Sequence, residues 1–198
     1  MTDKTIKSCL LCGVGGQGTV LASRIIAAAA MEKGRRARTA ETIGMAQRGG
    51  SVVSHVRTGD EIPSPMIPKG RTDILIGFEP GEAAANIEYL KANGTLILCA
   101  QEVKPITASL GRSAYDGNEC IDYLRSKVDR FYTIDVEKII EECGTSKVLN
   151  VAVVGALCAS GEMDLAIEDV DRVLGIRMKP KLVDVNRKAL RMGAACIG

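Results

Sequence analysis

The sequence predicts an α/β fold with a Rossmann-like, mainly parallel sheet, helices on both faces and a helical C-terminal region. Two observations support this. Short apolar runs alternate with longer helical segments, which is the pattern of parallel sheets. A G-x-G-x-x-G motif, formed by Gly13, Gly15 and Gly18, follows the first apolar run and precedes the first helix. The 198 residues suit one domain spanning 1–198.

The glycine loop is the first candidate site. Cys9-Leu10-Leu11 predicts the strand that leads into it. Its candidate ligand-facing residues are Gly13, Gly15, Gly16, Gln17 and Gly18. Glycine permits a tight turn and a close approach of a phosphate, and the free N–H groups of the following helix attract an anion. A second interpretation is a tight turn that serves packing alone.

The first half of the chain follows the same alternation. Residues 19–33 predict a helix with a wide apolar face, capped by Gly34. Strands are predicted at 35–40, 51–57, 73–78 and 95–99. Three prolines make 62–70 an exposed loop. Pro80 predicts a helix that starts at Glu79 and runs to about residue 92, where Asn93-Gly94 ends it.

The second half is predicted to be mainly helical. The expected elements are a helix at 118–129, a strand at 131–136, a short helix at 137–143, a buried helix at 148–159, and closing helices at 167–174 and 181–192. The helix at 148–159 is apolar nearly all round, which is typical of a buried helix.

Composition excludes several classes of protein. A net charge of +2 gives no broad surface for nucleic acid. No stretch approaches the ~20 apolar residues of a membrane span. The first residues contain no apolar leader segment, so we expect a cytoplasmic protein.

The seven cysteines fit a reducing compartment. Only Cys9 and Cys12 have C-x-x-C spacing, and they lie in the first predicted strand. Residues three apart on a strand point to opposite faces, so this pair is a poor chelate and is interpreted as core. We therefore expect no metal site and no iron–sulfur cluster on this chain.

A basic segment follows the first helix. An NAD-binding fold places an acidic residue near the end of its second strand, but here Arg35, Arg36 and Arg38 precede Glu41. The arginines suit an additional phosphate, such as that of NADP or the adenosine of coenzyme A (CoA). They equally suit a solvated rim. Simple NAD binding is disfavoured.

A second glycine-rich loop is the other candidate site, with candidate residues Met45, Gln47, Arg48 and Gly49. It is expected near the ligand edge of the sheet, although Arg48 also suits pairing with a local carboxylate. His55, the only histidine, is interpreted as structural. Glu79, at a strand end, is either functional or the start of a helix. Without a catalytic constellation, the chain resembles one part of a larger enzyme, and we assign it no catalytic residue.

Three motifs carry a family resemblance: Gly13-Val-Gly-Gly-Gln-Gly18, Gly44-Met-Ala-Gln-Arg-Gly-Gly-Ser51 and Pro63-Ser-Pro-Met-Ile-Pro68. They resemble the gamma module of 2-oxoacid:ferredoxin oxidoreductases. Asp73-Ile-Leu-Ile-Gly-Phe-Glu-Pro80 is most similar to the indolepyruvate type within that family. Further similarity at 147–155 and 184–190 extends the resemblance over nearly the whole chain.

The resemblance implies an enzyme that converts a 2-oxoacid, CoA and oxidised ferredoxin to acyl-CoA, carbon dioxide and reduced ferredoxin. It implies that thiamine diphosphate and [4Fe-4S] clusters lie on a larger alpha subunit and none on this chain. The loops 13–18 and 45–50 are then expected to face CoA or the partner's active site, with an aryl-pyruvate as the favoured substrate. Nucleic acid and membrane partners are not expected.

Two other classes remain open. One is a free-standing NADP- or nucleotide-binding protein with a Rossmann-type fold. The other is a purely structural subunit whose glycine loop serves packing alone. The missing acidic residue disfavours the first, and the two glycine loops at the expected ligand edge disfavour the second.

Overall fold

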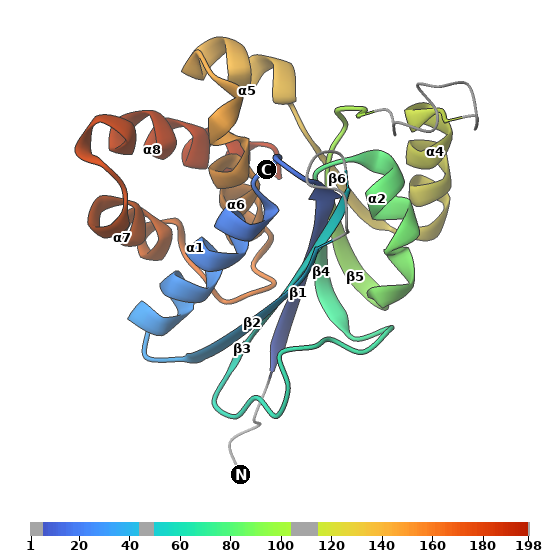
Figure 1. The fold of residues 1–198 in the computed structure, drawn as a ribbon, viewed down its shortest axis with the longest axis horizontal. Helices are drawn as coiled ribbons and strands as arrows, with labels where there is room; N and C mark the ends of the chain where they lie inside the picture. The colour runs from blue at the N-terminus through green and yellow to red at the C-terminus, as the bar shows by residue number, and fades with distance from the viewer. Residues whose placement is uncertain (1–5, 44–49, 104–114, 198) are drawn as a thin grey trace.

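The computed structural model describes residues 6–43, 50–103 and 115–197. A six-stranded sheet with the order β2-β3-β1-β4-β5-β6 forms its centre (Figure 1). The strands are β1 (Lys7–Val14), β2 (Arg36–Ile43), β3 (Ser51–Gly59), β4 (Thr72–Gly77), β5 (Leu90–Cys99) and β6 (Arg130–Ile134). The predicted α/β class is confirmed.

One strand runs against the others. β1, β4, β5 and β6 pair in parallel, whereas β3 is antiparallel to both of its neighbours, β1 and β2. β2 therefore points the same way as β1, although β3 lies between them. The sheet is mainly parallel, as predicted, but the strand after the first helix does not pair with β1.

Helices cover both faces of the sheet. They are α1 (Thr19–Glu32), α2 (Pro80–Ala85), α4 (Gly117–Lys127), α5 (Val136–Cys143), α6 (Leu149–Ser160), α7 (Ile167–Arg177) and α8 (Pro180–Ala195). Two short 3₁₀ turns are η1 (Ile87–Tyr89) and η2 (Ser146–Val148). One face carries α1 and α5 to α8, and the other carries α2 and α4 (Figure 1).

Each face has its own apolar core. Cys9 and Leu11 contribute to the larger cluster, under α1 and the C-terminal helices. Leu10 and Cys12 contribute to the smaller one, under α2 and α4. Cys9 and Cys12 thus point to opposite faces and are buried free thiols, which confirms their interpretation as core.

The helix predicted from Glu79 to about residue 92 is wrong in its second half. α2 ends at Ala85, because the Asn86 side chain donates to the Glu82 carbonyl oxygen at 2.9 Å and the chain turns into η1. Leu90 then already pairs with Thr72 of β4. Gly94 lies inside β5, where a Cβ would come within 2.5 Å of Leu90 Cδ1. Glycine here marks a strand irregularity rather than a helix end.

The loop between β3 and β4 is irregular, as predicted, but it is not fully exposed. Ile62 and Ile67 are buried. The Ile67 N–H donates to His55 Nδ1 at 3.3 Å, and Arg57 donates to the Ser64 carbonyl oxygen at 2.8 Å. The loop therefore packs onto β3, and His55 has the structural role predicted for it.

The C-terminal helices pack closely where two glycines meet. A Cβ on Gly155 of α6 would lie 1.9 Å from the Leu190 carbonyl oxygen of α8. A Cβ on Gly193 of α8 would lie 1.8 Å from the Ala152 carbonyl oxygen of α6. Both backbones therefore approach at positions that only glycine permits.

None of the described helices alone has the length and apolar character of a membrane span. Val136–Cys143 and Ser146–Ser160 reach those limits only when taken together, and they are bent by 115° at the break between them.

Candidate functional site

The glycine loop lies at the carboxyl end of β1, the edge at which open α/β sheets bind ligands. Gly16 and Gly18 have φ values of +103° and +90°. Gly18 is the residue that precedes α1. The left-handed backbone at both positions explains the need for glycine.

Gln17 holds the loop together from inside. Its Oε1 accepts from the Val14 N–H at 2.7 Å, and its Nε2 donates to the Phe78 carbonyl oxygen at 3.0 Å. Gly13 leaves room for this arrangement, because a Cβ there would lie 2.7 Å from Gln17 Oε1. Gln17, predicted to face a ligand, therefore ties β1 to the end of β4.

Replacing Gln17 by leucine is expected to lower the free energy of unfolding by about 1–3 kcal/mol, since two largely buried backbone groups lose their partner. Chemical denaturation of the purified chain measures this. Gln101→Leu is the control, because Gln101 is an exposed residue at the same pocket. Equal stabilities for the two variants would contradict the role assigned to Gln17.

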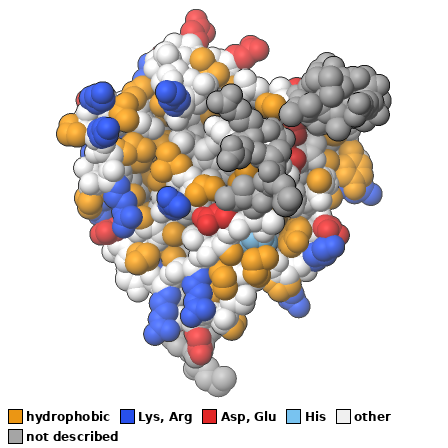
Figure 2. Space-filling model, viewed as in Figure 1, with side chains coloured by type: hydrophobic (Ala, Val, Ile, Leu, Met, Phe, Trp, Pro, Cys, Tyr) orange, Lys and Arg blue, Asp and Glu red, His pale blue; other side chains and the backbone are white. Residues whose placement is uncertain are grey.

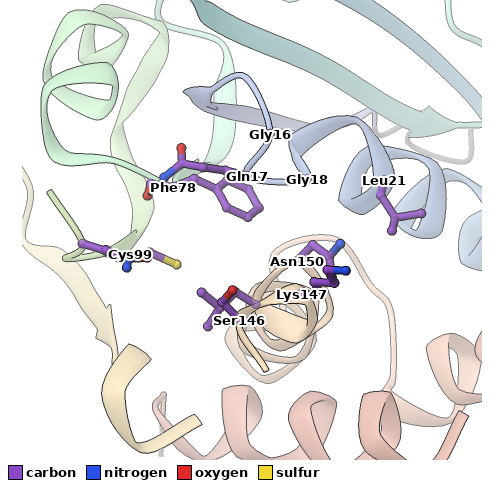
Figure 3. A pocket seen from close by; sticks show the side chains of 11 residues that line it. Gly16, Gln17, Gly18, Leu21, Phe78, Cys99, Ser146, Lys147 and Asn150 are labelled. Carbon is purple, nitrogen blue, oxygen red and sulfur yellow. Dashed lines mark hydrogen bonds between the residues drawn. The ribbon is translucent and has the colours of Figure 1, made fainter. Parts of the chain in front are cut away.

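A pocket of about 400 Å³ opens beside the loop, between the ends of β4 and β5 and the start of α6 (Figure 3). It is lined by Gly16, Gln17, Gly18, Leu21, Phe78, Cys99, Gln101, Ser146, Lys147, Leu149 and Asn150. None of these lining residues is acidic, and Lys147 is the one charged residue among them. The pocket thus suits a ligand that carries negative charge.

Cys99 adds a thiol to the pocket wall. Burial raises its pKa to about 12, so the thiol stays protonated at neutral pH. A protonated buried thiol is a weak nucleophile. Cys99 therefore contributes an apolar surface rather than a reactive group.

Asn150, in the first turn of α6, packs against Gly18 at the wall of the pocket. It is 7% exposed, and within the described part of the chain its Oδ1 has no hydrogen-bond partner. A Cβ on Gly18 would lie 2.8 Å from Asn150 Nδ2. Sequence patterns did not identify Asn150, although a lone polar side chain near the start of an otherwise apolar helix was the available signal.

The same edge carries the anchors of the second glycine-rich loop. The Gly15 N–H donates to the Gly50 carbonyl oxygen at 2.9 Å, and Ser51 Oγ donates to Glu82 Oε2 at 2.6 Å. Burial raises the pKa of the Glu82 carboxyl. The candidate residues of that loop, Met45, Gln47, Arg48 and Gly49, lie outside the described residues.

Glu79 is buried and caps α2. Its Oε2 accepts from the Glu82 N–H at 2.9 Å, and the Tyr115 hydroxyl donates to its Oε1. The Tyr115 oxygen in turn accepts from the Gly81 N–H at 3.2 Å. Glu79 was interpreted either as a functional residue or as the start of a helix. These contacts match the start of a helix.

The arginines of the basic segment lie at the opposite edge of the sheet from the glycine loop, where β1 and β2 begin. Arg38 pairs in register with Arg57, which is opposite Ser8 near the beginning of β1. The seven residues from Ser8 to Val14 separate that edge from the glycine loop by about 20 Å. Figure 2 shows Lys and Arg side chains at the lower end of the view, where β2 begins in Figure 1. They form a rim and do not reach a phosphate at the loop.

No group of three or more His, Cys, Asp or Glu side chains among the described residues is placed to hold a metal ion. Burial lowers the pKa of His55, which keeps the ring neutral in its contact with the loop after β3.

Comparison with known proteins gives a consistent result. Residues 8–196 match the family model described as pyruvate ferredoxin/flavodoxin oxidoreductase. The chain is 43% identical over 182 residues to indolepyruvate oxidoreductase subunit IorB of Archaeoglobus fulgidus, covering 91% of this chain and 90% of that one. It is 37% identical to the subunit of the same name from Pyrococcus horikoshii, covering 93% and 92%.

Solved structures share the fold. The gamma subunit of a keto/oxoacid ferredoxin oxidoreductase from Geobacter sulfurreducens superposes with a TM-score of 0.73 at 22% identity, over 98% of this chain and 97% of that one. A 2-oxoglutarate:ferredoxin oxidoreductase chain from Magnetococcus marinus, solved with 2-oxoglutarate, CoA and succinyl-CoA, also gives 0.73 at 18% identity. The match covers 98% of this chain and 31% of that longer one.

Proposed function

This chain belongs to the pyruvate ferredoxin/flavodoxin oxidoreductase family, and we propose that it is the cofactor-free subunit of an enzyme that oxidises indolepyruvate or another aryl-pyruvate. In the proposed reaction the C1–C2 bond of the 2-oxoacid breaks and releases carbon dioxide. Two electrons pass to two oxidised ferredoxins. The acyl group forms a thioester with the sulfur of CoA, whose thiol proton is released.

The chemistry at the 2-oxoacid is assigned to a larger partner subunit. Thiamine diphosphate bound there would stabilise the carbanion left by decarboxylation, and [4Fe-4S] clusters would carry the electrons. The seven cysteines of this chain are free and spread over both faces of the sheet and the C-terminal helices, an arrangement that does not suit a cluster. The role left to this chain is to bind and orient CoA.

The observation that carries the proposal is the pocket at the carboxyl edge. Glycine backbone, the beginning of α6 and Lys147 border one cavity, and none of the described residues that line it is acidic. Such a wall favours the phosphates of CoA electrostatically, and holding CoA in place lowers the entropic barrier to acyl transfer. The CoA-containing structure of the Magnetococcus relative supports CoA as the ligand to test.

The choice of an aryl-pyruvate rests on the relatives. Four curated relatives at 32–43% identity carry the name indolepyruvate oxidoreductase subunit. The alternative, a free-standing NADP-binding protein, loses its main support because Arg36 and Arg38 begin the strand at the edge far from the glycine loop.

The test is purification of the tagged chain from its native host under gentle conditions, followed by activity measurement. We expect a brown complex with a larger subunit that contains thiamine diphosphate. The complex should reduce ferredoxin in a CoA-dependent reaction, with a higher kcat/KM for indolepyruvate than for pyruvate or 2-oxoglutarate. A colourless chain that elutes alone would overturn the proposal, and a preference for 2-oxoglutarate would overturn the aryl-pyruvate assignment.

A further inference from the structure

We propose that the side-chain amide of Asn150 is the hydrogen-bonding anchor for a secondary amide of the pantetheine arm of CoA. The inference rests on the proposed function, which supplies CoA as the ligand. It assigns a binding role to a residue at the start of α6 and a specific part of the ligand to the pocket beside it.

Asn150 has unused hydrogen-bonding capacity. It is 7% exposed, and Oδ1 lacks a partner within the described residues. Another buried asparagine behaves differently: Asn186 Nδ2 donates to the Leu182 carbonyl oxygen at 2.7 Å. A buried polar atom without a partner is costly, and a ligand bound in the pocket is a partner available to it.

The position of Asn150 places its amide within reach of a ligand in the pocket. Asn150 lines the pocket, opposite Gly18 of the glycine loop (Figure 3). The terminal torsion of an asparagine is soft, so its amide can turn Oδ1 toward a bound group. Gly18 leaves room for the Asn150 side chain, because a Cβ there would lie 2.8 Å from Asn150 Nδ2.

The chemistry of Oδ1 indicates which part of CoA it contacts. Oδ1 is an acceptor and requires a donor, which neither a phosphate nor a carboxylate offers at neutral pH. A secondary amide has one donor and one acceptor, and it therefore complements both ends of an asparagine amide. The pantetheine arm of CoA contains two such amides. The phosphates are left to Lys147 and the backbone N–H groups of the same pocket.

The experiment compares Asn150→Leu with wild type in the assembled enzyme. Leucine has nearly the same shape and no hydrogen-bonding group. We expect KM for CoA to rise about tenfold, while kcat at saturating CoA and KM for the 2-oxoacid stay unchanged. The melting temperature of the free chain should be unchanged or higher, because an unpartnered buried group is removed.

Asn186→Leu is the matched control, since it makes the same change at a buried asparagine on α8 outside the pocket. It should lower the melting temperature and leave KM for CoA unchanged. A purely structural role of Asn150 predicts the same behaviour for both variants. That outcome would refute the inference.

Competition by 3′,5′-ADP, the nucleotide part of CoA without its phosphopantetheine arm, locates the contact. Asn150→Leu should weaken the binding of CoA but not the binding of this competitor. Equal weakening of both would place Asn150 at the nucleotide and overturn the amide assignment. If the wild-type enzyme shows no CoA dependence, the proposed function itself fails. If the wild-type enzyme depends on CoA, and the KM of Asn150→Leu for CoA stays within twofold of the wild-type value, only this inference fails.

Discussion

Replacing Gly155 by alanine is expected to lower the free energy of unfolding by about 3 kcal/mol or more, the upper range for overpacked cores. The added Cβ would lie 1.9 Å from the Leu190 carbonyl oxygen. This neighbour is backbone, so no side-chain rotation relieves the contact, and α6 must move away from α8. Urea denaturation followed by circular dichroism measures the loss.

Gly193→Ala on α8 is expected to have a similar effect, because its Cβ would lie 1.8 Å from the Ala152 carbonyl oxygen of α6. One displacement of the two helices relieves both contacts. The double variant should therefore lose less stability than the sum of the two single variants. Additive losses would indicate that the two glycines act independently.

Gly175→Ala in α7 is the control for helix propensity. Gly175 is exposed, and its Cβ would meet only the Arg187 side chain, at 3.7 Å. The same substitution there should be neutral or stabilising by up to about 1 kcal/mol. If Gly155→Ala is also neutral or stabilising, the close approach of α6 and α8 is not what fixes glycine at that position.

Gly18→Ala is expected to impair the pocket as well as the fold. A left-handed residue without glycine costs about 1–2 kcal/mol, and the new Cβ would lie 2.8 Å from Asn150 Nδ2. The start of α1 must then move relative to α6, which changes the distance between the two walls of the pocket. We expect KM for CoA in the assembled enzyme to rise at least tenfold.

Gly34→Ala separates backbone strain from pocket geometry. Gly34 follows the other end of α1 with φ +77°, and a Cβ there meets no atom within 4 Å. Both variants should lose similar stability from strain, but only Gly18→Ala should change the CoA kinetics. Identical kinetics for the two would remove the glycine loop from the ligand site.

Local signals predicted most of the elements. Gly34 and Gly144 follow α1 and α5 with positive φ, as helix ends require, and Pro80 begins α2. Strand order was not predictable in this way, because pairing depends on residues far apart in the chain. The alternation of apolar runs in the sequence does not reveal that β3 is antiparallel or that it lies between β2 and β1.

The position of the glycine loop in the fold was predicted, but the contacts around the loop were not. The glycine loop lies at the expected edge, yet Gln17 is bonded to backbone on both sides. Asn150 comes from a helix more than 130 residues later, and only the folded chain brings it opposite Gly18. Sequence patterns report the neighbours of a residue along the chain, whereas a pocket depends on neighbours in space.

The reversed direction of β3 has a consequence for the order in which the protein folds. β2 and β3 form a hairpin closed between Ile43 and Val52, whereas β1 must also meet Ile74 of β4. Closing the shorter loop loses less chain entropy, so we expect the hairpin to form first and β1 to insert between β3 and β4 afterwards. During synthesis on the ribosome, β1 would thus be the first strand to emerge but among the last to pair within the sheet.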